Sequence, residues 1–385
     1  MDKISIIVVF RDRDVIRVQR FLESLNHQDN RNFELIFIDN GSDTVLAQQV
    51  RQIVNTYDFA NYYYNDSRGK DFNKSIALNI GAELAVGDYF YFVDVDLMFS
   101  QGFIDHIYKL RNANAHIYTR VFMINESFQE YEELGEKKDF EEFSVLSSTS
   151  GRGIVMMPKK VFFEIGGYDE YYTDWGLEDN DMYVRLKAYG LKEVWAYDER
   201  FPVFHQWHPS NERFHFFPEK WLDEITFYAI INQNKPIRNN VGVRGLVDEG
   251  KRNLMNCINS ELGIPTIHIP LTGLYPTKTL YYRTIWEHIT DKNIKVFKII
   301  VPNYCQPKLS IFHTLLSSVF KKILILTKSP FSLKYFQTHE RHKYFLPEVD
   351  IKWLFRKIVK EPNLIKDYYI EYNQDETIYY VENIN

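Results

Sequence analysis

The alternation of apolar runs with helically spaced apolar residues in the first hundred positions constrains the fold more than any other feature. Ile4 to Phe10 is an almost continuous β-branched and aromatic run, which is typical of a parallel strand buried on both faces. The next apolar residues recur at helical spacing: Val15, Val18, Leu22 and Leu25. The chain therefore begins with a strand followed by a helix.

The same alternation continues as far as residue 94. The pattern predicts strands over 33–39, 62–65 and 89–93, and helices over 44–57 and 72–84. Repeated βαβ units build a mostly parallel sheet flanked by helices, so the fold class is α/β.

Polar residues stand at the ends of these predicted strands. Ligands in open parallel sheets bind beyond the carboxyl ends of the strands. Arg11, Asp39 and Asp94 each occupy such an end. We therefore expect the three side chains to gather at one edge of the sheet and to line a ligand site.

The length of 385 residues indicates more than one domain. Beyond Trp221 the regular alternation gives way to mixed helix and strand signals. We place a boundary within 215–255, with an α/β domain over 1–230 and an α or α+β region over 231–385.

Charge and cysteine usage exclude several classes of protein. A net charge of −6 argues against a general nucleic-acid binder, which needs a basic face. Cys257 and Cys305 fit no metal-binding spacing and suit a reducing compartment. The apolar run after Met1 is too short for a signal peptide, and no later run reaches membrane length. We expect a cytoplasmic protein, and the alternative is a protein that associates peripherally with a membrane.

Asp94-Val95-Asp96 follows an apolar strand directly. Carboxylates at positions i and i+2 on a chain leaving a strand can approach one hard divalent cation, and Mn²⁺ and Mg²⁺ prefer such oxygen ligands. The simpler alternative is a solvated turn in which an aspartate caps a helix.

A second acidic cluster lies in Trp175-Gly176-Leu177-Glu178-Asp179. The helical spacing of Met182 and Leu186 places Glu178 and Asp179 near a helix start, where carboxylates are favoured by the helix dipole. They are therefore either capping residues or a general base for a hydroxyl group. Trp175 is suited to stacking on a sugar.

Basic and imidazole groups complete the candidates. His205 and His208, at positions i and i+3 after an apolar strand, are either structural residues or metal ligands. Arg11 and Arg13 leave the first strand together, and Lys74 stands near a helix start. Each of these cations is either solvated surface charge or a phosphate contact.

The ordered set of segments resembles the GT-A nucleotide-sugar glycosyltransferases, and β-1,4-galactosyltransferases in particular. The segments are Phe10-Arg11-Asp12-Arg13, Phe72-Asn73-Lys74, Leu78-Asn79-Ile80-Gly81, Asp94-Val95-Asp96, Gly151-Arg152-Gly153 through Ile165-Gly166-Gly167-Tyr168-Asp169, and Trp175-Gly176-Leu177-Glu178-Asp179. Bacterial family 2 enzymes such as chondroitin polymerase share several of them. The resemblance covers roughly residues 3–210.

The resemblance implies a UDP-sugar donor, Mn²⁺ or Mg²⁺, and an inverting transfer to a hydroxyl of a glycan or lipid-linked glycan. The implied donor-binding residues are Arg11, Arg13, Asp39, Lys74, Asp94, Trp175 and Gly176. The implied metal ligands are Asp96, with Asp94 near the metal and ribose, and His205, with His208 as the second option. Bacterial surface polysaccharide synthesis is the expected setting.

The same resemblance implies that Asp179 is the catalytic base and that Glu178 helps to bind the acceptor. Leu177 and Asn180 stand where the galactosyltransferases have Gly and Asp, and the histidine segment lacks their methionine ligand. The C-terminal region would serve acceptor recognition or oligomerisation, because it is rich in aromatic and basic residues.

Two other functions are compatible with parts of the pattern. A sugar-phosphate nucleotidyltransferase would need a glycine-rich phosphate loop after the first strand, and residues 10–14 contain no glycine. A glycan-binding or scaffolding protein on the same fold would have lost the metal and base carboxylates, which are all present here.

Overall fold

The computed structural model describes residues 2–124, 145–149, 153–174, 176–208, 219–232, 253–260, 263–269, 273–302, 344–345, 347–360, 364–373 and 376–384. The chain divides into two compact units, Met1–Arg252 and Asn253–Asn385. Trp175, Gly151, Arg152 and Cys305 lie outside the described residues.

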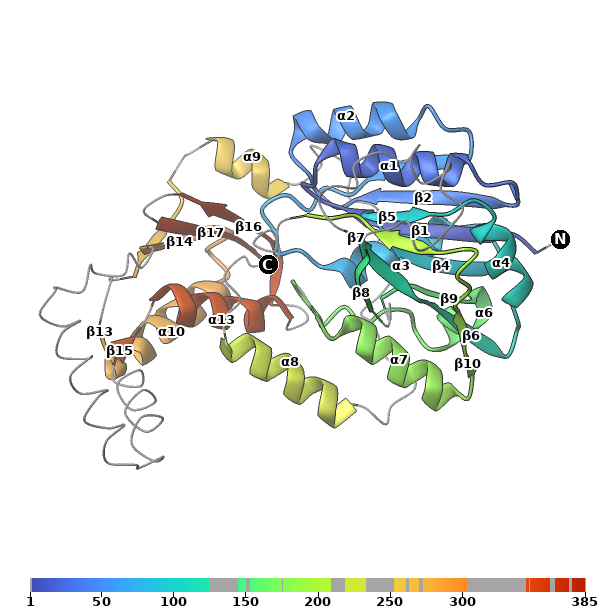
Figure 1. The fold of residues 1–385 in the computed structure, drawn as a ribbon. Helices are drawn as coiled ribbons and strands as arrows, with labels where there is room; N and C mark the ends of the chain where they lie inside the picture. Colours follow the sequence, from blue (N-terminus) through green and yellow to red (C-terminus); the bar gives the residue numbers. More distant parts are fainter. Residues whose placement is uncertain are drawn as a thin grey trace, which may run out of the picture. The chain divides into compact units, whose positions relative to one another are not determined.

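A seven-stranded sheet of order β10-β6-β9-β4-β1-β2-β3 forms the centre of the first unit. Its strands are β1 (Ile4–Phe10), β2 (Phe33–Asp39), β3 (Ala60–Tyr64), β4 (Tyr89–Asp94), β6 (Ala115–Thr119), β9 (Val155–Pro158) and β10 (Lys192–Ala196). Only β9 runs antiparallel to its two neighbours in this sheet. The mostly parallel α/β architecture expected from the sequence is confirmed (Figure 1).

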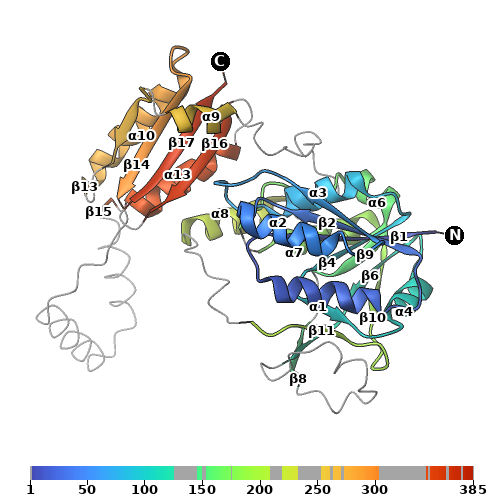
Figure 2. The same ribbon diagram turned by 90° about the horizontal axis from the view of Figure 1, so that it is seen from above.

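Helices cover both faces of this sheet. One face packs against α1 (Val15–Asn26), α2 (Thr44–Val54) and α4 (Phe103–Leu110). The other packs against α3 (Lys74–Leu84), α6 (Lys159–Glu164) and α7 (Glu178–Tyr189). In Figure 2, α1 and α4 lie on the side of the sheet opposite α3 and α6.

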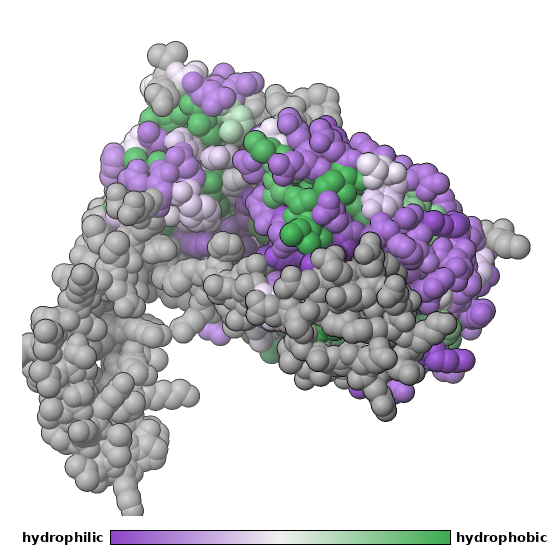
Figure 3. Space-filling model, turned by 45° about the horizontal axis from the view of Figure 1, so that its top comes forward, coloured by the Kyte–Doolittle hydropathy of each residue, from purple (hydrophilic) through white to green (hydrophobic). Residues whose placement is uncertain are grey.

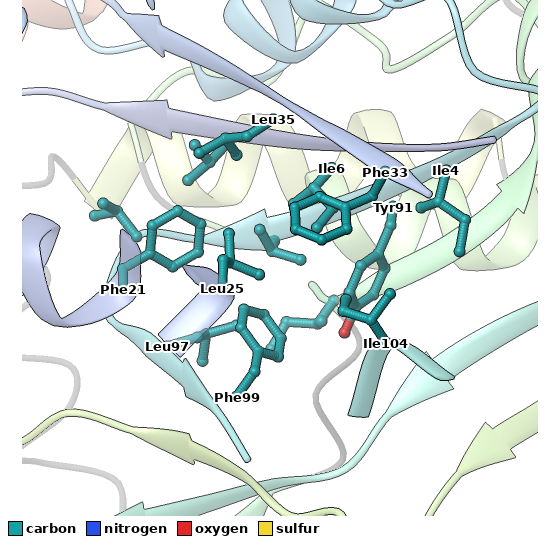
Figure 4. Packing of buried hydrophobic residues seen from close by; sticks show 14 of the residues in the cluster. Ile4, Ile6, Phe21, Leu25, Phe33, Leu35, Tyr91, Leu97, Phe99 and Ile104 are labelled. Atoms are coloured by element: carbon teal, nitrogen blue, oxygen red, sulfur yellow. The ribbon is translucent and has the colours of Figure 1, made fainter. Parts of the chain in front are cut away.

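The strands separate the two cores by the alternation of their side chains. Ile4, Ile6 and Val8 of β1 belong to one apolar cluster, whereas Ile7 belongs to the other. Figure 4 shows Phe21 of α1 packing beneath the sheet, near aromatic rings contributed by other elements. Because both faces are covered, β1 and β2 are apolar almost throughout.

A second sheet has four strands in the order β5-β11-β7-β8, and its strand β5 follows the carboxyl end of β4 in the chain. Its strands are β5 (Leu97–Phe99), β7 (Val121–Ile124), β8 (Val145–Thr149) and β11 (Val203–His205). β11 pairs antiparallel with β5, and His205 lies opposite Leu97 in the register. This pairing joins the two candidate motifs, which are about a hundred residues apart in the sequence.

The first unit extends to Arg252. Helix α8 (Glu219–Asn232) belongs to it, because the fully buried Ile225 packs with Tyr172.

The second unit is an α+β structure with its own core. A four-stranded sheet of order β12-β14-β17-β16 contains β12 (Thr266–His268), β14 (Val296–Pro302), β16 (Ile365–Tyr372) and β17 (Glu376–Asn383). A two-stranded sheet pairs β13 (Gly273–Leu274) with β15 (Tyr344–Phe345). The helices are α9 (Asn253–Ser260), α10 (Tyr275–Thr290) and α13 (Pro347–Lys360). α10 and α13 supply buried residues to the main cluster, and α9 packs through Leu254 with β17.

The described surface in Figure 3 is mostly hydrophilic and carries an apolar patch. Exposed apolar side chains occur near the start of both α1 and α2, where Ile16 is 55% and Val45 is 65% exposed. Among the described helices, none has the length and apolar character needed to cross a membrane.

Candidate active site

The carboxyl ends of the central strands bring the predicted residues to one edge of the sheet. Phe10 pairs in register with Asp39, and Val9 pairs with Asp94. Arg11 follows β1 directly and donates a hydrogen bond from Nη1 to the carbonyl of Lys70, 3.0 Å away. The parallel register therefore places Arg11, Asp39 and Asp94 along the edge where the sequence predicted a ligand site.

Asp96 and two histidines form a compact group just beyond this edge. Oδ2 of Asp96 lies 3.3 Å from Nε2 of His205 and 3.6 Å from Nε2 of His208. One ligand atom from each residue can be chosen so that all lie within 4.8 Å of one another. The β5–β11 pairing and a hydrogen bond from the Gln206 amide to the Asp96 carbonyl, at 2.8 Å, hold the group together.

This group fits a divalent metal ion. A carboxylate oxygen with two imidazole nitrogens suits Mn²⁺ and related borderline cations. Oδ1 of Asp96 is buried without a hydrogen-bond partner in the described structure, and such an oxygen is satisfied by a metal. Burial alone would raise the pKa of Asp96, but His205 and His208 outweigh it and hold that pKa well below its ordinary value. These two histidines thus favour the ionised form of the Asp96 carboxylate.

Asp94 has a different partner from Asp96. Its Oδ1 lies 2.8 Å from Nζ of Lys74, the first residue of α3. Burial would lower the pKa of Lys74, yet the carboxylates of Asp94, Asp179 and Glu178 outweigh it and raise that pKa well above its ordinary value. A permanently charged ammonium therefore stands among three carboxylates.

Glu178 and Asp179 open α7, as the sequence predicted. The preceding residues make a tight turn, because Asp174, Gly176 and Leu177 all have positive φ values of 66°, 105° and 72°. For a non-glycine residue the left-handed conformation costs about 1–2 kcal/mol. Such strain is typical of functional sites, where the surroundings hold the chain in place.

Gly153 lies against the carboxylate of Asp179. A Cβ built on Gly153 would stand 2.7 Å from Oδ2 of Asp179, so only glycine leaves this carboxylate its place. The other oxygen, Oδ1, is buried without a hydrogen-bond partner in the described structure. Asp179 thus presents an unsatisfied acceptor, which is what a general base requires.

The first two residues of α7, Glu178 and Asp179, are weaker acids than exposed carboxyl groups. Burial, and then the neighbouring charge of Asp179, raises the pKa of Glu178 to about 7, although Lys74 acts in the opposite direction. Burial also raises the pKa of Asp179, again partly offset by Lys74. A carboxylate with a raised pKa is a stronger base than an exposed one.

Asp39 is fully buried at the sheet edge and holds a turn. Its oxygens accept hydrogen bonds from the amide of Ser42, at 2.9 Å, and the hydroxyl of Tyr62, at 2.8 Å. In this structure Asp39 therefore shapes the loop before α2, and Arg13 is a half-buried residue of the loop before α1.

Three further residues position the site, and none of them was among the predicted site residues. Gln206, between the two histidines, donates from Nε2 to the carbonyl of Arg17 at 3.1 Å. Asn79 of α3 donates to the carbonyl of Tyr168 at 2.9 Å. Arg185 is fully buried and pairs with Asp181 in α7 at 2.7 Å. The i and i+4 spacing of Asp181 and Arg185 was the available sequence signal.

Comparisons with known proteins show which family the first unit is similar to. The family model described as "Glycosyltransferase like family 2" matches residues 5–196. Human beta-1,4-galactosyltransferase 4 is 22% identical over 213 residues, which are 53% of this chain and 54% of that protein. An uncharacterised glycosyltransferase of Haemophilus influenzae is 26% identical over 191 residues, which are 48% of this chain and 61% of that protein.

The chain thus spans between half and two thirds of the length of these two relatives. Among solved structures, GalNAc-T7 with UDP, GalNAc and Mn²⁺ is similar at 15% identity and a TM-score of 0.43, over 55% of this chain and 44% of that one. The family match and the relatives agree with the α/β fold described above. Residues 5–196 form a glycosyltransferase domain of the glycosyltransferase-like family 2.

Proposed function

We propose that this protein is an inverting, metal-dependent glycosyltransferase that moves a sugar from a UDP-sugar to a hydroxyl of a glycan or lipid-linked glycan. The observation that carries the proposal is the convergence of Asp96, His205 and His208 beside the Lys74–Asp94 pair. The expected setting is bacterial surface polysaccharide synthesis.

The residues divide the reaction between two sides of the site. Asp179 accepts the proton of the acceptor hydroxyl, whose oxygen then attacks the anomeric carbon while the bond to UDP breaks. Lys74 and Arg11 offer positive charge to the departing diphosphate. Mn²⁺ or Mg²⁺, held by Asp96, His205 and His208, supplies further positive charge there when bound.

The proposal is tested by incubating the protein with Mn²⁺ and a panel of UDP-sugars and measuring UDP release. We expect release with at least one donor, and its loss by roughly 100-fold or more in Asp96→Ala, because the anionic ligand is gone. Asp58→Ala, at an exposed position of the same unit, is the matched control and should retain activity.

No release with any donor, or release that Asp96→Ala leaves unchanged, contradicts the proposal. Mn²⁺ titration followed by electron paramagnetic resonance provides a readout besides turnover. Binding should weaken in Asp96→Ala and persist in Asp58→Ala.

A further inference from the structure

Helix α8 lies beyond residues 5–196, yet it packs against the chain that leads into the catalytic helix α7. We call residues 169–174 and 176–177 the entry loop. This loop ends at Leu177, immediately before Glu178. Any element that fixes the entry loop therefore also fixes the first turn of α7.

Two hydrogen bonds cross between α8 and the entry loop in opposite directions. The hydroxyl of Tyr228 on α8 donates to Oδ2 of Asp169 at 2.8 Å. The hydroxyl of Tyr171 on the loop donates to Oε1 of Glu224 on α8 at 2.9 Å. The rings of Tyr171 and Tyr228 stack with centroids 3.8 Å apart and planes 11° apart.

An apolar contact lies beside these bonds. Ile225 of α8 is fully buried, packs with Tyr172, and has Leu177 and Ala229 as further neighbours in the same cluster. Other described residues of the helix are exposed, including Phe227 at 61% and Ile230 at 56%. One face of α8 is thus committed to the entry loop.

The entry loop needs such support because of its backbone. Asp174 and Leu177 adopt left-handed conformations that non-glycine residues rarely keep unless their surroundings impose them. The loop is tied on its other side to the start of α3, where the Asp174 amide donates to the Phe72 carbonyl at 2.7 Å and Asn73 donates to the Glu170 carbonyl at 2.9 Å. The loop is therefore held between α3 and α8.

We propose that α8 is a clamp of the catalytic domain, and that Ile225 and Tyr228 are positioning residues that set the place of Glu178 and Asp179 through the entry loop. The inference rests on the proposed function for the role of Asp179. The contacts that carry it are independent of that role.

The experiment uses the full chain with three variants on α8: Ile225→Ala, Tyr228→Phe and Phe227→Ala. Amide hydrogen exchange of residues 169–177 is measured without donor, together with kcat, donor KM and thermal melting. Ile225→Ala should raise exchange in the entry loop and lower kcat by roughly 10-fold, because small displacements of a base cost that much or more. Donor KM should change less than kcat, since Asp96, His205 and His208 are held by the β5–β11 pairing.

Tyr228→Phe loses one hydrogen bond but keeps the ring, so it should show a smaller change of the same kind and secures the test if Ile225→Ala does not fold. Phe227→Ala should leave exchange and kinetics unchanged. Unchanged loop exchange in Ile225→Ala and Tyr228→Phe, or an equal response of Phe227→Ala, overturns the clamp. If the wild-type protein releases no UDP from any donor, the proposed function fails, while the exchange measurement still decides whether α8 holds the loop.

Discussion

Three aspartates at one edge of the sheet have three different environments. Asp96 faces two imidazoles, Asp94 faces the ammonium of Lys74, and Asp39 accepts hydrogen bonds inside the fold. The residue type is the same, so partners and burial alone decide which carboxylate is suited to a metal, to a charge network or to a turn. At this scale, function depends on neighbours within about 4 Å.

The first residue-scale prediction concerns Gly153. In Gly153→Ala the added Cβ would stand 2.7 Å from the Asp179 carboxylate and displace it. We expect kcat to fall by roughly 10- to 100-fold, because the base moves away from its place. Steady-state UDP release with an active donor measures the effect.

Gly190→Ala is the matched control for that change. Gly190 ends α7 with φ of 98°, and a Cβ there meets no atom within 4 Å. This variant should lose about 1–2 kcal/mol of stability through backbone strain while keeping kcat. If Gly190→Ala lowers kcat as strongly as Gly153→Ala, general destabilisation explains both.

The second residue-scale prediction concerns pH. The pKa of Glu178 rises from 4.5 to about 7 on folding, so the folded state favours its protonated form. This contribution to stability is complete below about pH 4.5 and is lost as the pH rises through about 7. Glu178→Gln, which cannot ionise, should therefore gain melting temperature relative to wild type as the pH rises from 4.5 to 7.

The measurement is thermal unfolding of both proteins in metal-free buffer from pH 4 to 8.5. The difference should be constant above about pH 8 and at its smallest near pH 4. A difference that shrinks as the pH rises would show that Glu178 ionises readily in the folded protein.

At the scale of elements, the start of α7 is fixed by a buried charge network. Arg185 pairs with Asp181 at 2.7 Å and donates to the carbonyls of Ile165, at 3.0 Å, and Gly167, at 2.6 Å. Three acceptors thus surround one guanidinium, and they join α7 to the turn after α6. Helix and turn are therefore joined beneath Glu178 and Asp179, the carboxylates proposed for catalysis.

Arg185→Met should destabilise the protein by about 3–5 kcal/mol, because it leaves the Asp181 carboxylate buried without its cation. Urea unfolding measures the loss. The double variant Asp181→Asn/Arg185→Met should recover part of it, since no charge is then buried alone. Arg200→Met, which breaks an exposed pair with Asp198, should leave the unfolding midpoint unchanged. Equal effects of the two single variants would refute the buried network.

The whole molecule contains two separate cores. Every buried apolar cluster among the described residues lies within one unit: three belong to Met1–Arg252 and two to Asn253–Asn385. Since hydrophobic burial drives folding, each unit has the means to fold by itself.

A chain that ends at Arg252 should therefore unfold cooperatively and keep slow UDP release from the donor. Transfer to acceptor should weaken, because the C-terminal unit is the proposed acceptor-recognition or oligomerisation module. Circular dichroism measures folding, and UDP release without and with acceptor measures donor hydrolysis and transfer. The same truncation with Asp96→Ala gives the background rate of UDP release. Loss of folding or of hydrolysis in the truncated chain would show that the second unit completes the first.

The sequence by itself determined the first strands and helices, and it supplied the residues proposed for the site. Almost continuous apolar runs placed β1 and β2 at the residues where the structure has them, because strands covered on both faces need mostly apolar side chains. Because β1, β2 and β4 run parallel, the polar residues at their carboxyl ends lie along the same edge of the sheet. The helix start at Glu178 also followed from local spacing.

Only the tertiary structure decided which of these residues meet. The β5–β11 pairing brings both histidines to Asp96, and local patterns carry no information on contacts between segments about a hundred residues apart. The antiparallel insertion of β9 after Gly153, the Lys74–Asp94 pair and the packing of α8 on the entry loop are likewise long-range contacts. Their partners are chosen by shape, burial and charge in the folded chain, because distance in space and not in sequence sets these energies.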